Sequence, residues 1–271
     1  GAIRRVPIRN SKITRRCSFH SWRNEEHTMR APRLRNVDKY APPYPLNAFP
    51  SGFPVRLGRE IVYVLATRKS PRLEGNDWEE IFASVVGADW RPSNVGLDDV
   101  VLEQTAWGAK TVKNKQPSMA KRVRLISGRN SPAYSFGDSK VTKRDPNELG
   151  AKILEIWNER VTGVRKLFRN VRTVVLIKSD DLQELAVFET DTVLYPRGRY
   201  TWQWNDNDNL EGTEMDTRIH RFTWQPHGSQ FTIIEDVPEN RLAIRIKAPA
   251  KLDKDDVLDA IKFDPSWVTL I

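Results

Sequence analysis

Residues 96–113, GLDDVVLEQTAWGAKTVK, predict two adjacent β-strands that carry a group of charged side chains. The first half is rich in Val and Leu, and small or apolar residues alternate through the second half, as in strands of a sheet. Asp99 and Glu103 are an even number of residues apart, so both would point to one face of the first strand. Lys110 could reach the same place from the second strand. The stretch therefore predicts acids and a lysine held together on a sheet.

These side chains suit a hydrolytic site. Carboxylate oxygens are hard ligands that suit a magnesium ion keeping most of its waters. A lysine ammonium beside them could orient an attacking water or stabilise charge on a phosphate. We therefore expect Asp99 and Glu103 to bind Mg²⁺ and Lys110 to act beside it, with Asp98 as an alternative to Asp99. The other interpretation is a structural hairpin with solvated acids at its end.

A third candidate acid lies upstream, in a predicted helix. Asn76 or Asp77 can cap a helix whose apolar residues recur at helical spacing as far as Gly87. Glu79 and Glu80 then fall in the first turn, where the helix dipole favours acids whatever their function. The functional alternative is that Glu80 turns toward the hairpin and binds the metal.

The arrangement resembles the PD-(D/E)xK nucleases, the superfamily that contains most type II restriction endonucleases. In these enzymes an Asp on one strand is followed by Glu or Asp, any residue and Lys on the next strand. Asp99 and Lys110 match the first and last positions, whereas Gly108 stands where the second acid would be. Some members supply that carboxylate from elsewhere, so Glu103 or Glu80 would take its place here.

The resemblance implies a fold, a cofactor and partners. The fold would be a mixed α/β core with the active strands central. The cofactor would be Mg²⁺, and the substrate would be double-stranded DNA. Two copies of the chain would act together on a palindromic site, so that both strands are cut.

The length and composition fit one large domain with an arm. The chain has 271 residues, which allows a sizeable core. We expect a basic, proline-rich N-terminal arm over residues 1–54 and a catalytic and DNA-binding domain over residues 55–271. The sequence has no run of about eighteen apolar residues that would predict a membrane span, and we expect no secretory segment. A single cysteine, Cys17, suits a reducing compartment such as the cytoplasm, and the resemblance to restriction endonucleases implies a prokaryotic cell.

Basic residues are segregated along the chain. The net charge is +9, and residues 1–40 carry eleven Lys or Arg against three acids, while residues 113–144 carry nine against one. Such segregation is expected of a surface that follows phosphates and releases counterions, although ordinary solvated loops are the alternative. We expect phosphate contacts from Lys113, Lys115, Lys121 and Arg124, and base contacts from Arg129 and Asn130.

The second half of the chain predicts a long helix followed by an antiparallel sheet. The sequence DPNE at 145–148 is a strong helix start, and the helix would run to about Phe168. Strand-like segments then alternate with turns, one of them at Asn205 to Gly212. Residues 220–232, HRFTWQPHGSQFT, predict a hairpin whose polar tip suits readout in a DNA groove. The candidates there are Arg221, Gln225, His227 and Gln230.

Taken together, the sequence predicts an α/β (α+β) fold with a mixed, largely antiparallel sheet flanked by helices. The leading functional hypothesis is a site-specific, Mg²⁺-dependent DNA endonuclease of the type II restriction kind. The alternative is a non-catalytic nucleic-acid-binding module of a larger assembly, which the missing acid at Gly108 favours. Other enzyme classes find no support, since there is no nucleophile elbow, Walker glycine loop or dinucleotide fingerprint.

Overall fold

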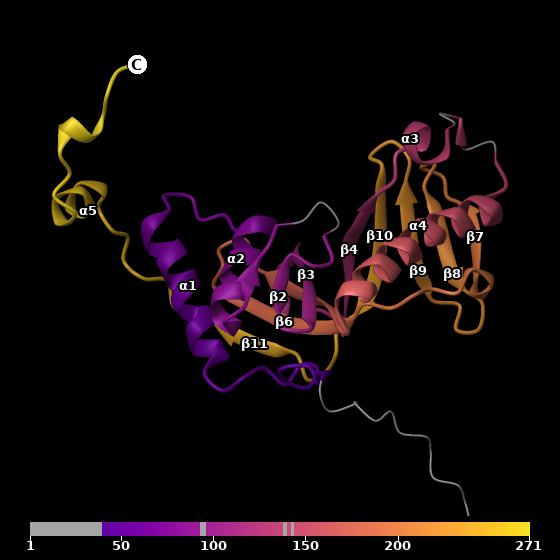
Figure 1. Cartoon of the computed structure of the whole chain (residues 1–271), viewed down its shortest axis with the longest axis horizontal. Coiled ribbons are helices and arrows are strands. Elements are labelled where there is room, and N and C mark those ends of the chain that lie inside the picture. The colour runs from indigo at the N-terminus through magenta and orange to yellow at the C-terminus, as the bar shows by residue number, and fades with distance from the viewer. Residues whose placement is uncertain (1–39, 93–95, 138–139, 142–143) are drawn as a thin grey trace, which may run out of the picture. The chain divides into compact units, whose positions relative to one another are not determined.

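The protein is described by a computed structural model covering residues 40–92, 96–137, 140–141 and 144–271. These residues form two sheets flanked by helices (Figure 1), which confirms the predicted mixed, largely antiparallel α/β architecture. No helix among them is long and apolar enough to cross a membrane. The first 39 residues of the predicted arm lie outside the described residues. The helices are α1 (Phe53–Thr67), α2 (Gly75–Val86), α3 (Pro132–Phe136), α4 (Pro146–Leu167) and α5 (Lys254–Ala260).

The first sheet contains the predicted hairpin. Its second strand is antiparallel to the first strand and parallel to a later strand, which places it in the interior of the sheet. The other neighbouring strands pair antiparallel. In spatial order the strands are β1 (Asp89–Trp90), β2 (Val100–Leu102), β3 (Thr105–Lys113), β5 (Asn170–Lys178), β6 (Glu184–Asp191) and β11 (Leu242–Arg245).

The second sheet is wholly antiparallel. It joins the strand that follows the hairpin to the meander near the C-terminus. In spatial order its strands are β4 (Arg122–Arg129), β10 (Gln230–Asp236), β9 (His220–Gln225), β8 (Leu210–Glu214) and β7 (Tyr200–Trp204).

Two expectations about the second half are wrong. The strands after the long helix do not form one sheet, because β5, β6 and β11 join the hairpin while β7 to β10 join β4. Part of the predicted turn at Asn205 to Gly212 belongs to β8. Most residues of β8 are polar, so its sequence resembles a turn. Gly212 belongs to this strand because a larger residue would not fit beside the neighbouring strand. A Cβ atom at this position would lie 2.9 Å from the ring of Trp202 on β7.

The predicted long helix is confirmed as α4. The Asp145 side chain accepts a hydrogen bond from the Glu148 amide at 2.8 Å and so caps the helix. Helix α2 is also present, but Glu74 caps it rather than Asn76 or Asp77. Asp77 completes the capping box from the third helical position, so the true start lies two residues before the predicted one.

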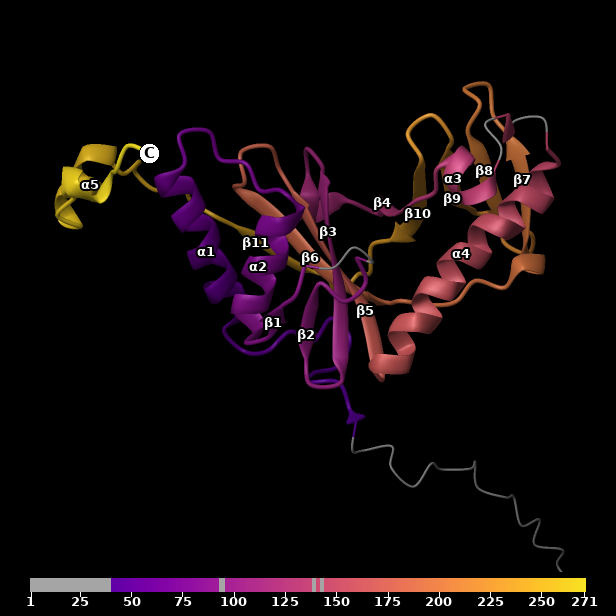
Figure 2. The ribbon, with the colours of Figure 1, turned by 45° about the horizontal axis from the view of Figure 1, so that its top comes forward.

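Separate apolar cores cover the two faces of the first sheet. Strand β5 shows this by alternation: Val174 and Leu176 pack with α1 and α2, whereas Val175 and Ile177 pack toward β4. A further core joins α4 to the second sheet, where Gly150 allows the ring of Trp202 to contact the helix backbone. Figure 2 shows α1 and α2 side by side and α4 against the second sheet.

Residues 40–54 pack onto this fold. Tyr44 donates to the Glu189 carboxylate at 2.9 Å, and the Asn47 side chain is hydrogen bonded to the Glu189 backbone. Phe49 stacks on Phe53 at the start of α1. The expected boundary at residue 54 therefore falls inside one packed unit.

Candidate functional site

The hairpin brings Asp99 and Lys110 together. Asp99 directly precedes β2 and is buried, and its carboxylate accepts a hydrogen bond from the Ala109 amide at 3.2 Å. Lys110 is the next residue on β3, and its Nζ donates to the Gly96 carbonyl oxygen at 3.2 Å. The backbone of β3 thus holds the acid beside the lysine.

Burial and four charged side chains set the electrostatics of this place. Burial lowers the pKa of Lys110. The negative charges of Asp99 and, to a smaller extent, Glu79 oppose this effect, whereas the positive charge of Arg160 reinforces it. Burial also lowers the pKa of the Arg160 guanidinium, while Asp99 raises it. Two cations and two carboxylates therefore act on one another in a partly dehydrated site, where electrostatic effects are stronger than in water.

The upstream helix contributes Glu79 rather than Glu80. Glu79 accepts a hydrogen bond from the indole of Trp90 at 3.2 Å and is one of the acids that act on Lys110. Glu80 is exposed and interacts with Arg68 on the other side of the helix. Sequence reasoning placed both acids in the first turn, but α2 begins at Gly75 and Asp77 is the acid of its first turn; it also assigned Glu80 rather than Glu79 to the hairpin. The sequence signal is that the apolar Phe82 and Ala83 follow Glu79 at three and four residues, whereas the polar Ser84 lies four residues after Glu80.

Glu103 does not join the group. It is exposed and lies in the turn between β2 and β3 with φ 51°, whereas Asp99 lies at the other end of β2. The even spacing implied a common face only if the strand ran through both residues. The left-handed backbone at Glu103 ends the strand and turns its side chain away. Of the two adjacent aspartates, Asp99 is the one that acts on Lys110.

A tight backbone crossing explains Gly108. A Cβ atom at this position would lie 2.7 Å from the Gly96 carbonyl oxygen and 3.1 Å from the Cα of Leu97. An acid at the position given by the resemblance would therefore collide with the loop that precedes Asp99. The described residues contain no group of three or more His, Cys, Asp or Glu placed to hold a metal ion.

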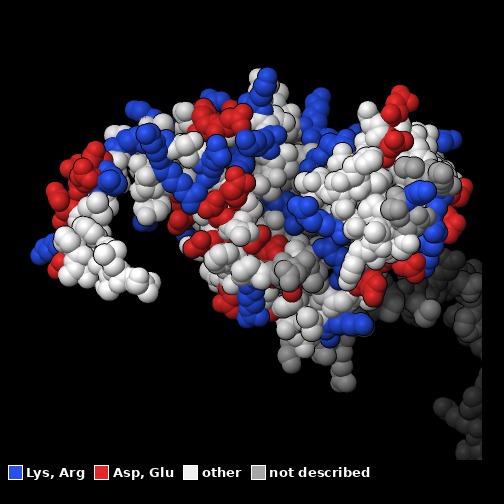
Figure 3. Space-filling view, turned by 90° about the horizontal axis from the view of Figure 1, so that it is seen from above, with Lys and Arg blue, Asp and Glu red and all other residues white. Residues whose placement is uncertain are grey.

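A cleft of about 430 Å³ opens beside Lys110. Four elements meet there: β3 supplies Lys110, the end of β4 supplies Arg129 and Asn130, α3 supplies Tyr134, and α4 supplies Arg160. Three of these five side chains are basic. Figure 3 shows Lys and Arg side chains gathered near the middle of this view. The cleft is suited to an anionic ligand.

Sequence reasoning missed Arg160 as a site residue, because it lies three residues after the buried Trp157 and four before the buried Val164, along the apolar stripe of α4. Its guanidinium donates to the Ser127 carbonyl oxygen at 2.7 Å and lies 6.0 Å from the ring of Trp157. A cation within an apolar stripe was the signal that could have identified it, because a buried charge requires partners.

The structure brings several of the predicted DNA contacts to one end of the second sheet. Gln230 pairs with Gln225 and with Arg129 across the sheet, and His227 is exposed in the turn beside them. The Asn130 amide donates to the Ser229 carbonyl oxygen at 2.8 Å, which ties the hairpin tip to the cleft. Residues almost one hundred positions apart thus form one polar surface.

The other predicted contacts lie away from this surface. Arg221 donates to the Ile234 carbonyl oxygen at 2.9 Å and lies near Glu235 and Asp236. Arg124 donates to the hydroxyl of Thr223. The remaining lysines, Lys113, Lys115 and Lys121, are exposed, and Lys113 pairs with Asp180 at 3.2 Å.

Comparison of the chain with protein-family models, curated proteins and solved structures gives no match.

Proposed function

We propose that this protein is a Mg²⁺-dependent endonuclease that cleaves double-stranded DNA at specific sites, as type II restriction enzymes do. The observation that carries the proposal is Lys110, which lines a basic cleft from β3 while the buried Asp99 acts on it from the residue before β2. This pair occupies the first and last positions of the PD-(D/E)xK pattern. Nucleic acid is the substrate class that a basic cleft of this kind favours.

Two carboxylates, Asp99 and Glu79, act on Lys110, and two are enough for a magnesium ion whose other ligands would come from water and the substrate. Mg²⁺ is commonly held by one or two carboxylates, with waters and phosphate oxygens as the other ligands. Asp99 would hold the ion, and Glu79 takes the part first given to Glu80 and Glu103. When bound, Mg²⁺ activates water and offsets charge on the scissile phosphate.

The residues of the chain have separate roles in this proposal. Lys110 orients the water or stabilises the charge that develops on the phosphate, and burial strengthens that interaction. Arg160 and Arg129 hold the DNA backbone in the cleft. Gln225, His227 and Gln230 contact the duplex from the hairpin tip. Two copies acting on a palindromic site in a prokaryotic cytoplasm would cut both strands.

A cleavage assay tests the proposal. Purified protein is incubated with phage or plasmid DNA, with Mg²⁺ and with EDTA, and the products are separated on a gel. Discrete bands that vanish in EDTA are expected. Uncut DNA under all conditions, with an intact Asp99 and Lys110, would refute the endonuclease assignment.

The second candidate is a nucleic-acid-binding module without catalysis. The blocked position at Gly108 favours it, since the second carboxylate of the pattern cannot stand there. Under this alternative, the same protein would shift DNA on a native gel in a salt-dependent way, and Mg²⁺ would make no difference.

A further inference from the structure

Asn130 is an unusual lining residue of the cleft beside Lys110. It is 3% exposed, although it lines an open cleft. Its backbone is engaged at both ends, because the amide donates to Ser229 and the carbonyl oxygen accepts from the Trp224 indole at 3.0 Å. No hydrogen bond joins its side-chain amide to the described part of the chain, and the amide stays accessible from the cleft. A ligand that enters the cleft can therefore pair with it.

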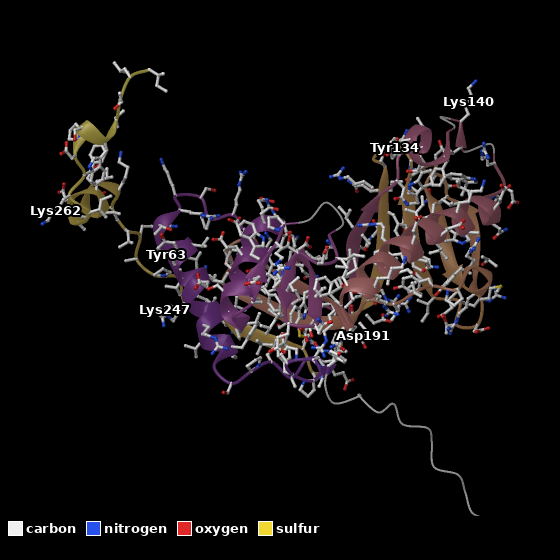
Figure 4. The ribbon with its side chains drawn as sticks, in the orientation of Figure 1. Tyr63, Tyr134, Lys140, Asp191, Lys247 and Lys262 are labelled. Atoms are coloured by element: carbon white, nitrogen blue, oxygen red, sulfur yellow. The ribbon has the colours of Figure 1, made fainter. Side chains whose placement is uncertain are left out.

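Tyr134 provides an aromatic surface at the same cleft. It is 94% exposed, and it lines the cleft from α3, where Figure 4 labels it. An aromatic face that no protein group covers can stack on a nucleobase, and such stacking tolerates any base. Arg129 and Arg160 line the same cleft and can hold the phosphate that accompanies a base.

We propose that this cleft receives one nucleotide of the DNA strand, with its adenine base stacked on Tyr134 and its edge read by Asn130. The Asn amide offers a donor beside an acceptor, which matches the N7 acceptor and the N6 donor of adenine, whereas the same edge of cytosine offers only a donor and that of thymine only an acceptor. The inference rests on the proposed action on DNA and adds the entry of a base into the protein.

The burial of Asn130 requires that the base leave the duplex. A side chain that reads a paired base in a groove must protrude from the protein surface, as the exposed His227 does. Asn130 does not protrude, so only a group that enters the cleft can reach it. A base that is extruded from the stack, or that is already unpaired, can do so, and unpairing costs less when the opposite base is missing.

Binding of single-stranded probes in EDTA tests the inference without cleavage. Fluorescein-labelled dA12, dT12 and dC12 are titrated with protein, and polarisation is recorded. The wild type is expected to bind dA12 roughly tenfold more tightly than dT12 and dC12. Asn130→Ala should bind all three alike, and Tyr134→Ala should weaken all three by roughly tenfold. Because Tyr134 is exposed, its replacement leaves folding intact even if Asn130→Ala does not fold.

Two exposed residues of the same types serve as matched controls. Tyr63→Ala on α1 and Asn207→Ala in the turn before β8 should leave all affinities unchanged. A duplex with an adenine opposite an abasic site should bind several-fold more tightly than the fully paired duplex, and Asn130→Ala should remove that advantage.

The outcomes separate this inference from the proposed function. Equal affinity for the three oligonucleotides, or a preference for dA12 that survives Asn130→Ala, would overturn the adenine pocket even if the protein cuts plasmid DNA. A preference that depends on Asn130, with no cleavage in Mg²⁺, would retain the pocket and refute the endonuclease. Tighter binding of dC12 would overturn the choice of adenine.

Discussion

The Ala109 amide donates to the Asp99 carboxylate over 3.2 Å, which fixes the acid next to Lys110 on the neighbouring strand. A main-chain donor of a sheet moves little, so the carboxylate is held in place, and the Gly96 carbonyl oxygen accepts from the Lys110 ammonium at 3.2 Å. This preorganisation is what an electrostatic catalyst needs, since the groups need no rearrangement during the reaction.

Replacing Lys110 tests the chemistry of the hairpin directly. Lys110→Met keeps most of the aliphatic chain and removes the ammonium. The rate of cleavage in a single-turnover assay should fall by about 10²–10³-fold, because a buried charge beside the phosphate is lost. DNA affinity in EDTA should change little. Lys247→Met, which replaces an exposed lysine with no assigned role, is the control, and normal cutting by Lys110→Met would remove the hairpin from the mechanism.

Glu79 and Glu80 are adjacent acids of α2, and the first serves as the test and the second as its control. Glu79→Gln should raise the Mg²⁺ concentration for half-maximal cleavage by roughly tenfold or more, because Glu79, the acid of α2 that acts on Lys110, is proposed to bind the ion with Asp99. Glu80→Gln should behave as the wild type, since Glu80 is exposed and interacts with Arg68. A titration of cleavage against Mg²⁺ measures both. The reverse result would place Glu80 at the metal, as the sequence alone suggested.

Gly108 should tolerate no side chain. Gly108→Ala is expected to lower the free energy of unfolding by about 1–3 kcal/mol, because its Cβ would overlap the backbone of the preceding loop. Gly163→Ala on α4 has open space around it, so this variant should gain about 0.5–1 kcal/mol. Urea unfolding measures both, and a Gly108→Ala variant as stable as Gly163→Ala would contradict the close crossing.

The buried ion pair of Arg172 and Glu189 should matter for stability. Their nearest atoms are 3.2 Å apart, and the Glu189 carboxylate also accepts from Tyr44 and Trp107. Glu189→Ala should cost about 3–5 kcal/mol, because the buried guanidinium loses its partner. Glu155→Ala, which breaks an exposed pair with Arg197, should cost about 0–1 kcal/mol. Equal urea midpoints for Glu189→Ala and Glu155→Ala would argue against a stabilising role of the Arg172–Glu189 pair.

Glu235 should make stability depend on pH. Burial raises its pKa, while Arg221 and the hydrogen bond from Tyr195 oppose that effect. The folded form therefore holds the proton longer than the unfolded form, so stability is greatest below the unfolded pKa and falls as pH rises through the folded pKa. Glu235→Gln still accepts a bond from Tyr195 and carries no charge.

The expected result is a difference in unfolding free energy between Glu235→Gln and the wild type. It should be small near pH 4 and should grow in favour of the variant toward about pH 7. The exposed Glu239→Gln serves as the control and should show no such trend. A difference that stays constant with pH would mean that Glu235 does not carry a buried charge.

Local patterns were sufficient for several elements. The alternation around Asp99 and Lys110 predicted the hairpin of β2 and β3, and Asp145 predicted the start of α4. Such signals depend on residues close in the sequence, where spacing and capping act directly. They failed for β8, whose polar residues become a strand only because β7 and β9 pair with it.

The sequence by itself determined the mixed α/β class, the hairpin that holds Asp99 near Lys110, and the polar turn at His227. Only the tertiary structure decided that Glu79 faces the lysine in place of Glu80, that Glu103 turns away, and that Gly108 is closed to an acid. It also brought Arg160, Asn130 and Tyr134 to one cleft. The physical reason is that periodicity fixes which side of its own element a residue occupies, whereas the neighbours of that side depend on how the elements pack.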